Sequence, residues 1–289
     1  MKQGSLIRNS FQFEITVLLN RSADQTVKPA AEEIKEALTM KTRHSKILEY
    51  ITEHGKTEVS VLSDKLQAST VTIRKDLDYL EERGMLKRER GFAVPNDPGD
   101  IFYRMAFHAD KKQRIARTAA AYIENGETVM IESGSTCTLL AEELARTKKS
   151  VTIVTNSVCL AEYVRSYSNI QLILLGGILQ TPSQSLVGPL TRQAAEAFHV
   201  DKIFTGIDGY SRSFGFTGDD LTRADTLHAM IASARHVYVL TDSEKFRHPG
   251  AVSFLQLDQV YEIITDEGIP PEEKSFLESQ NIRITIADN

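Results

Sequence analysis

The chain has 289 residues, a formal net charge of −5 and 41% hydrophobic residues. This length accommodates two domains that each bury a core, and the negative charge excludes a protein that is basic throughout. The two cysteines exclude a disulfide-rich framework and fit the reducing cytoplasm, where we expect the protein to be located. No apolar run reaches about 18 residues, so we expect no membrane span. The seven histidines show no metal-ligand spacing, and we expect neither a metal site nor a cofactor.

The charge is unevenly distributed along the chain. Residues 41–95 carry 11 Lys and Arg against 9 Asp and Glu, residues 1–40 are balanced, and residues 96–289 hold a net charge of −7. A mildly basic module on an acidic body is compatible with nucleic-acid binding.

Residues 1–39 look separate from the segment that follows. FQFEITVLL (11–19) alternates like a strand, and PAAEEIKEAL (29–38) is typical of a short helix with a proline in its first turn. A second start-like sequence begins at Met40. We interpret 1–39 as an N-terminal extension, with a mis-assigned start as the alternative.

Residues 40–94 are predicted to form a winged helix-turn-helix domain. Short helices are expected at about 43–54 and 60–67, and a third helix follows the turn ASTV. The stretch MLKRERGFAV (85–94) predicts two extended arms around a basic, glycine-containing turn. The third helix would bury Ile73, Leu77 and Leu80.

The charge order of this third helix predicts how it meets DNA. Ser69 or Thr70 is expected to be its N-cap, and Thr72, Arg74, Lys75 and Asp76 are expected to lie outside or on the flanks of the apolar stripe. Cations come first and acids come later, so that the helix would enter the major groove by its N-terminus rather than lie along the phosphates. The candidate DNA-binding residues are Ser69, Thr70, Thr72, Arg74 and Lys75 on the helix, and Lys87, Arg88 and Arg90 on the wing.

The stretch PNDPGD (95–100) is the predicted linker, and residues 101–289 form the second domain. Short apolar runs occur at 128–133, 151–155, 170–175, 202–207, 237–241, 260–265 and 282–286, with helical patterns such as KKQRIARTAAAYI and AEELART between most of them. This alternation is typical of a largely parallel sheet covered by helices. The predicted fold class is therefore α/β: a winged helix-turn-helix domain followed by a three-layer α/β domain.

Several of these strands end in small polar residues and glycines. In a parallel sheet, ligands bind at the carboxyl ends of the strands, where helix N-termini offer backbone N–H groups to phosphate. A strand-to-helix turn needs such residues for capping anyway, but five turns on one predicted edge favour a binding site. The candidate effector-binding residues are Glu132, Gly134, Ser135, Thr136, Asn156, Ser157, Gly176, Gly177, Asp208 and Lys245.

The N-terminal motif resembles the signature of the DeoR family of transcriptional repressors. TVTIRKDLDYLEERGMLKRERGFAV is similar to its threonine-isoleucine-arginine-arginine-aspartate-leucine motif and basic wing. Lys75 replaces the second arginine, which keeps the charge but loses the planar fork for bidentate base contacts. Gly91, Phe92 and Ala93 stand where the family usually has two glycines before an alanine.

The second domain also resembles the DeoR family. The similar segments are KQRIARTAA, IESGST, VTNS, LLGG, LVGPL, FTGIDG, GFTGDD and TDSEKF, in that order. The resemblance implies a sensor domain similar to ribose-5-phosphate isomerase, glucosamine-6-phosphate isomerase and CoA-transferase folds, which binds a phosphorylated sugar and thereby changes operator affinity. Glu132 stands where the family often has aspartate, and Ser135 where it often has threonine.

The sequence thus predicts a repressor of a carbohydrate-metabolism operon, not an enzyme. Its partners would be double-stranded operator DNA, a phosphorylated sugar and further copies of the chain in a homodimer or homotetramer, because one short helix contacts few bases. One alternative is a phosphosugar isomerase, although Asp208-Gly209-Tyr210-Ser211 lacks the second acid of the isomerases' aspartate-glycine-alanine-aspartate turn. Another is a DNA-binding protein without any metabolite input.

Overall fold

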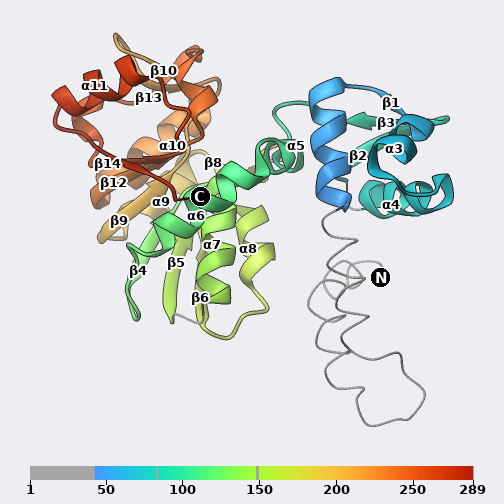
Figure 1. Cartoon of the computed structure of the whole chain (residues 1–289). Helices are drawn as coiled ribbons and strands as arrows, with labels where there is room; N and C mark the ends of the chain where they lie inside the picture. Colours follow the sequence, from blue (N-terminus) through green and yellow to red (C-terminus); the bar gives the residue numbers. More distant parts are fainter. Residues whose placement is uncertain (1–42, 83, 148–149, 289) are drawn as a thin grey trace. The chain divides into compact units, whose positions relative to one another are not determined.

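A computed structural model describes residues 43–82, 84–147 and 150–288 (Figure 1). The predicted extension 1–39 lies outside these residues. The chain divides into two compact units between Pro98 and Gly99, within the predicted linker. Each unit has a hydrophobic core of its own.

The N-terminal unit is a winged helix-turn-helix. It contains a first helix over 43–54, β1 (Thr57–Glu58), α3 (Val59–Leu66), α4 (Thr70–Glu82), β2 (Leu86–Glu89) and β3 (Phe92–Pro95). The predicted three helices and wing hairpin are confirmed. The strand β1 was not predicted, because two residues are too short for an alternating pattern. It pairs with β3, so that the two wing strands belong to a three-stranded antiparallel sheet with β3 in the centre.

The core of this unit follows the predicted apolar stripes. Ile73, Leu77 and Leu80 of α4 are 0–1% exposed, and they pack with Ile47 and Ile51 of the first helix. Gly55 has a φ of 74°, and its N–H donates to the carbonyl of Ile51. A left-handed residue of this kind ends a helix at low cost only when it is glycine.

The second unit is built on a seven-stranded parallel sheet. Its order is β15 (Arg283–Ile286), β14 (Glu262–Thr265), β12 (Ala234–Leu240), β9 (Val200–Thr205), β4 (Thr128–Ile131), β5 (Val151–Thr155) and β6 (Ile170–Leu174). All neighbours in the sheet are parallel. The helices are α5 (Ile101–Ala106), α6 (Ala109–Ala120), α7 (Ser135–Arg146), α8 (Val158–Val164), α9 (Pro189–Glu196), α10 (Leu221–Ala232) and α11 (Pro271–Ser279), with 3-10 turns η1 (Ser243–Phe246) and η2 (Leu257–Gln259).

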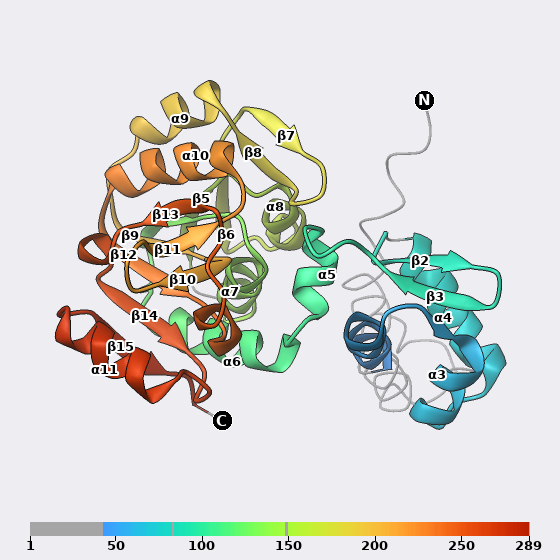
Figure 2. The ribbon, with the colours of Figure 1, turned by 90° about the horizontal axis from the view of Figure 1, so that it is seen from above.

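Alternate residues of each central strand enter two different cores. Ile203 of β9 packs with α9 and α10, whereas its neighbour Phe204 packs with α6, α7 and α8. Met130 and Ile131 of β4 are divided in the same way. Side chains on a strand point alternately to its two faces, so a sheet covered on both faces needs a continuous apolar run. The predicted three-layer α/β architecture is therefore confirmed (Figure 2).

Some elements did not show in the sequence pattern. They are the hairpin β7 (Ile178–Gln180) and β8 (Ser185–Val187), and a small antiparallel sheet of β10 (Gly209–Ser211), β11 (Gly215–Gly218) and β13 (Val252–Leu255). The helix α5, which directly follows the linker, was also not predicted. These elements have three to six residues each, which is too short for a period to be recognised. Among the described residues, no helix is long and apolar enough to cross a membrane.

Candidate functional site

The tip of α4 carries the predicted cap and cations. The Ser69 hydroxyl accepts a hydrogen bond from the Thr72 N–H at 3.1 Å, so Ser69 is the N-cap and Thr70 is the first helical residue. The hydroxyls of Ser69 and Thr72 are 2.9 Å apart. Arg74 and Lys75 are exposed on the first turns, where the helix dipole adds to their positive charge.

Asp76 was predicted outside or on a flank of the apolar stripe of α4, but it is buried. Its side chain is 4% exposed and accepts hydrogen bonds from Arg43 and His44 of the first helix, with Arg43 Nη2 at 2.9 Å and His44 Nε2 at 3.0 Å. Burial alone raises the pKa of Asp76, but the hydrogen bonds and charges of Arg43 and His44 outweigh it and lower the pKa below 3.8. Asp76 therefore joins α4 to the first helix, a role that helical periodicity did not reveal because the partners lie about thirty residues away.

The wing holds one cation that faces its own domain. Arg88 forms an ion pair with Asp78 of α4, and its backbone N–H donates to Glu81 at 3.0 Å. Lys87 and Arg90 are exposed. Arg88, one of the three wing cations predicted to contact DNA, thus ties the wing to the acidic end of α4. The other two, Lys87 and Arg90, have their side chains at the surface.

In the second unit, the order of the sheet defines a switch point. The chain runs from β4 outward through β5 and β6, then returns to β9 on the other side of β4 and runs outward through β12, β14 and β15. The helices after β4 and β5 pack on one face, whereas α9, α10 and α11 pack on the other. Open α/β sheets bind ligands at the carboxyl ends of the strands where the order reverses in this way. The five predicted turns follow β4, β5, β6, β9 and β12, so all of them lie on that edge.

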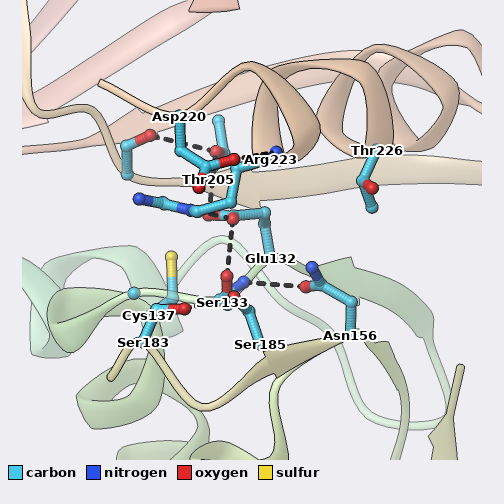
Figure 3. A network of polar contacts seen from close by, with 12 residues as sticks. Glu132, Ser133, Cys137, Asn156, Ser183, Ser185, Thr205, Asp220, Arg223 and Thr226 are labelled. Carbon is cyan, nitrogen blue, oxygen red and sulfur yellow. Dashed lines mark hydrogen bonds and ion pairs between the residues drawn. The ribbon is translucent and has the colours of Figure 1, made fainter. Parts of the chain in front are cut away.

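Glu132 directly follows β4 at this point (Figure 3). It is 2% exposed, and its oxygens accept hydrogen bonds from the hydroxyls of Ser133 at 2.7 Å and Thr205 at 3.4 Å. The Arg223 guanidinium forms an ion pair with it at 3.5 Å. Burial raises the pKa of Glu132 above 4.5, and the charge of Arg223 offsets this only in part.

Asp208 follows β9 and is held between two arginines. Its Oδ1 accepts from Arg104 Nη2 at 2.6 Å, and its Oδ2 accepts from Arg223 Nη1 at 3.1 Å. Burial raises the pKa of Asp208, but the charges of Arg104, Arg223 and Lys245 lower it overall below 3.8. Arg223 is 7% exposed, its guanidinium lies 5.3 Å from the Phe254 ring centroid, and its Nε has no hydrogen-bond partner among the described residues.

The turn after β12 adds a further charged group. Asp242 is 1% exposed. Burial raises its pKa, but the nearby His108, Lys112 and Lys245 together outweigh burial and lower the pKa to about 2. Lys245 follows on η1 and is half-buried. Its charge also lowers the pKa of Asp208, so Lys245 lies within electrostatic reach of both carboxylates.

The turn at the start of α7 has no side-chain cap. Gly134 is the N-cap and provides no side-chain cap, and Ser135 and Thr136 form the first turn, each 5% exposed. The first N–H groups of a helix have no acceptor within the helix, so this turn offers them to an anion.

Other predicted effector residues are engaged in structural contacts. Asn156 accepts from the Ser133 N–H at 2.9 Å and donates to the Leu186 carbonyl at 3.1 Å, and Ser157 caps α8 through the N–H of Leu160. These contacts fix the strand-end turns against one another. They do not exclude a ligand, but they use the same polar atoms.

The pair Gly176 and Gly177 permits a close approach of backbone. A Cβ on Gly177 would lie 1.9 Å from Thr191 Oγ1 and 2.8 Å from the Val187 carbonyl oxygen, and Thr191 Oγ1 donates to the Gly176 carbonyl. The φ of Gly177 is 145°, which side chains rarely adopt. These glycines therefore allow the start of α9 to pack against the end of β6.

The sequence did not single out Arg104, Arg223 or Thr205. Arg104 lies on α5 and Arg223 on α10, far from any strand end in the sequence. Thr205 lies within the predicted strand KIFTGI. Arg223 could have been found from the sequence, because it lies only three residues after the family-like segment GFTGDD, in LTRAD. Among the described residues, no group of three or more His, Cys, Asp and Glu side chains could hold a metal ion.

A winged helix-turn-helix followed by an α/β domain with a polar switch point defines a transcriptional regulator with a sensor domain. The DeoR-like helix-turn-helix domain model matches residues 43–98, and the DeoR C-terminal sensor domain model matches residues 107–267. The chain belongs to the DeoR family, which confirms the resemblance found in the sequence.

The chain is similar to two bacterial regulators, and about half of it aligns weakly with one solved structure. The chain is 30% identical over 247 residues to the uncharacterized HTH-type transcriptional regulator YulB of Bacillus subtilis, which covers 84% of this chain and 95% of the relative. It is 28% identical over 247 residues to the glycerol-3-phosphate regulon repressor of Escherichia coli, covering 84% and 98%. Ribose 5-phosphate isomerase A of Methanocaldococcus jannaschii aligns with a TM-score of 0.36 and 19% identity, over 48% of this chain and 54% of the isomerase.

Proposed function

We propose that the chain is a repressor of a carbohydrate-metabolism operon, and that a phosphorylated sugar bound at the switch point changes its affinity for the operator. The observation that carries this proposal is the meeting of Glu132, Asp208 and the uncapped start of α7 at the carboxyl ends of β4 and β9. The turn at Gly134 would take the phosphate, and the two carboxylates would take sugar hydroxyls.

The charge of the site supports an anionic ligand. Arg104, Arg223 and Lys245 all act on Asp208, and Lys245 also acts on Asp242. Arg223 Nε is buried without a hydrogen-bond partner among the described residues, and an anionic oxygen would supply one. The family's sensor domain and the named role of the glycerol-3-phosphate regulon repressor point in the same direction.

The same contacts speak against catalysis of sugar isomerisation. Proton abstraction requires a carboxylate within reach of a carbon-bound proton. Asp208 has both oxygens engaged by arginines, and Glu132 is engaged by two hydroxyls and Arg223. This arrangement favours binding over turnover, and a panel of sugar phosphates showing turnover would contradict it.

At the other end of the chain, α4 would enter the major groove by its N-terminus. Ser69, Thr70, Thr72, Arg74 and Lys75 would contact DNA, with Lys87 and Arg90 on the phosphates. Arg88 would act through Asp78 by fixing the wing. Two copies of the chain would read the two half-sites of an operator, because one recognition helix reaches few base pairs.

The test of DNA recognition uses an operator selected from random-sequence DNA by the full chain. Arg74→Ala should weaken binding to the selected site by about 1–3 kcal/mol and binding to random DNA much less. Arg90→Ala is the matched control, because loss of a phosphate contact weakens both to a similar extent. Equal losses on both DNAs for Arg74→Ala would demote Arg74 to a phosphate contact.

The test of effector binding is thermal. A ligand at 100 times its Kd should stabilise the folded chain by about 2.7 kcal/mol. We expect one member of a panel of three-, five- and six-carbon sugar phosphates to do so and to change operator affinity, and Lys245→Ala to lose both responses while binding operator normally. A wild-type chain that ignores the whole panel would refute the proposed sensor function.

A further inference from the structure

The segment that follows the linker runs along the carboxyl edge of the sheet, where its basic side chains lie beside acidic residues at the ends of three strands. Arg104 pairs with Asp208 after β9 at 2.6 Å, and Lys111 pairs with Asp266 after β14 at 3.0 Å. Between them, His108 Nδ1 lies 3.7 Å from Asp242 after β12. The strands β9, β12 and β14 are neighbours in the sheet. We call residues 101–114 the strap.

The strap has a break at its centre. α5 ends at Ala106, Phe107 is extended, and His108 has a φ of 53° and a ψ of 41° before α6 begins. A residue with a side chain is strained in this left-handed region, because its Cβ crowds the following carbonyl oxygen. The Nδ1 of His108 is buried and has no hydrogen-bond partner within the described part of the chain. A strained residue between two rigid helices is where the strap can bend.

The two halves of the strap are held by different kinds of contact. α6 is fixed by Lys111, which also donates to Ser243 at 3.2 Å, and by Arg114, whose guanidinium meets Glu267 at 3.1 Å. The side chains of α5 contribute one ion pair to the sheet edge, that of Arg104. Its backbone is tied by Lys112, which donates to the carbonyls of Arg104 and Phe107 beside the break, and by the N–H of the buried Ile101, which donates to the Pro182 carbonyl at 2.9 Å.

The Arg104–Asp208 pair is the part of the ionic cluster that a ligand can reach first. The side chains of Arg104 and Asp208 are 15% and 16% exposed, whereas those of Arg223 and Glu132 are 8% and 2% exposed. Arg223 pairs with two carboxylates, but Arg104 pairs with one. Of the two arginines that pair with Asp208, Arg104 is therefore the one that an incoming anion can more easily recruit.

We propose that Arg104 is an effector-binding residue that exchanges Asp208 for an anionic oxygen of the effector, and that α5 thereby turns about His108. This rests on the proposed function of the switch point. The consequence reaches the linker through the chain itself. Asp100 caps α5 by accepting from the Phe102 N–H at 2.8 Å, and Gly99 and Pro98 precede it directly. A rotation of α5 moves the point at which the chain leaves the sensor domain. Binding of the effector to Arg104 would therefore change the position of the linker.

The first test needs no ligand. Hydrogen exchange, measured by mass spectrometry on the full chain, follows the amides of Arg104 and Phe107, which donate to the carbonyls of Asp100 and Tyr103. Arg104→Gln should increase their exchange about tenfold, and Arg104→Lys should restore part of the protection. Arg114→Gln is the matched control, because it removes a strap cation that pairs outside the switch point. Equal α5 exchange in Arg104→Gln and Arg114→Gln would refute the strap.

The second test uses the sugar-phosphate panel. The active member should raise α5 exchange in the wild type and change operator Kd. Ligand-free Arg104→Gln should already bind operator within about threefold of the ligand-saturated wild type and should show no further response. A response of Arg104→Gln equal to that of the wild type would overturn the inference and leave the proposed function intact. If the wild type responds to no member of the panel, the proposed function and the role of Arg104 in effector binding are both refuted. Whether Arg104 holds α5 in place is then still decided by the exchange data of the first test.

Discussion

Each domain buries a carboxylate between two basic side chains, but the two sites differ in how completely they are closed. Asp76 of the DNA-binding domain is 4% exposed, and its partners are Arg43 and His44. Asp208 of the sensor domain is 16% exposed, and one of its partners, Arg223, leaves its Nε without an acceptor among the described residues. The pKa of both carboxyls is lowered by these partners in spite of burial.

The difference separates a structural ion pair from one suited to binding. A buried polar group that supports folding is fully satisfied, because an unmade hydrogen bond in the interior costs about 1–3 kcal/mol. A binding site instead keeps donors that a ligand completes. Arg223 Nε and His108 Nδ1 are buried donors or acceptors of this kind, and both lie beside the sheet edge.

The largest expected effect tests the closed site. Asp76→Ala should lower the free energy of opening of the DNA-binding domain by about 3 kcal/mol, because it leaves Arg43 and His44 without their carboxylate. Hydrogen exchange of peptides from 43–82 measures this domain within the full chain. Asp78→Ala is the control, since its carboxylate is 57% exposed and should cost less than about 1 kcal/mol.

The pH dependence of the closed site follows from the same pKa. Because folding lowers the pKa of Asp76 from 3.8, its contribution to stability is present above that value. It is lost as the pH falls through the lower, folded pKa. Asp76→Ala should therefore lack this part of the acid-induced loss, and an unchanged acid transition would contradict the assignment.

The second prediction applies the equivalent change to the open site. Asp208→Ala should cost the sensor domain about 1–2 kcal/mol, less than Asp76→Ala costs its own domain. Arg223 keeps Glu132 as a partner, and Arg104 is 15% exposed and can turn to water. Exchange of sensor-domain peptides gives the comparison, and a loss as large as that of Asp76→Ala would show that the cluster mainly supports folding.

The sequence predicted the elements of both domains well, but not the partners of their charges. The apolar stripe of α4 and the doubly buried strands follow from short-range periodicity, as Ile73 and Phe204 show. Asp76 looked solvated because Arg43 lies 33 residues away, and Asp208 looked like a lone acid because Arg104 lies 104 residues away. Such pairings depend on tertiary contacts that a single sequence does not reveal.

The strand-end turns were the easier part of the site. Five polar turns could be placed on one edge because parallel strands share a direction, and the sheet order confirms that placement. The sequence could not show which atoms those turns already use. Ser157 caps α8 and Gly177 packs against Thr191. Their roles toward a ligand stay predictions.

The third prediction concerns Lys112, which joins α6 to α5. Burial lowers its pKa from 10.5 to about 7, and Asp242 offsets this only in part. Above pH 7 the folded amine is neutral while the unfolded one still binds a proton, so stability should rise with pH in this range. Lys112→Met should remove a slope of at most about 1.4 kcal/mol per pH unit between pH 7 and 9. Chemical denaturation at several pH values measures the free energy of unfolding of the wild type and of the variant. Titrations common to both proteins cancel in the difference between the two. If the two free energies change with pH in parallel, the low pKa of Lys112 is refuted.

The smallest expected effect has the opposite sign from that of Asp76. Burial raises the pKa of Glu132 above 4.5, so the folded chain holds this proton more tightly than the unfolded chain does. Its contribution to stability is fully present below pH 4.5 and is lost as the pH rises through the folded pKa. Glu132→Gln imitates the protonated carboxyl and keeps an acceptor for Ser133 and Thr205. The variant should therefore match the wild type in acid and exceed it at pH 7, as measured by denaturation at both pH values. A variant less stable at pH 7 would show that the ion pair with Arg223 outweighs burial, and the open site would then resemble the closed one.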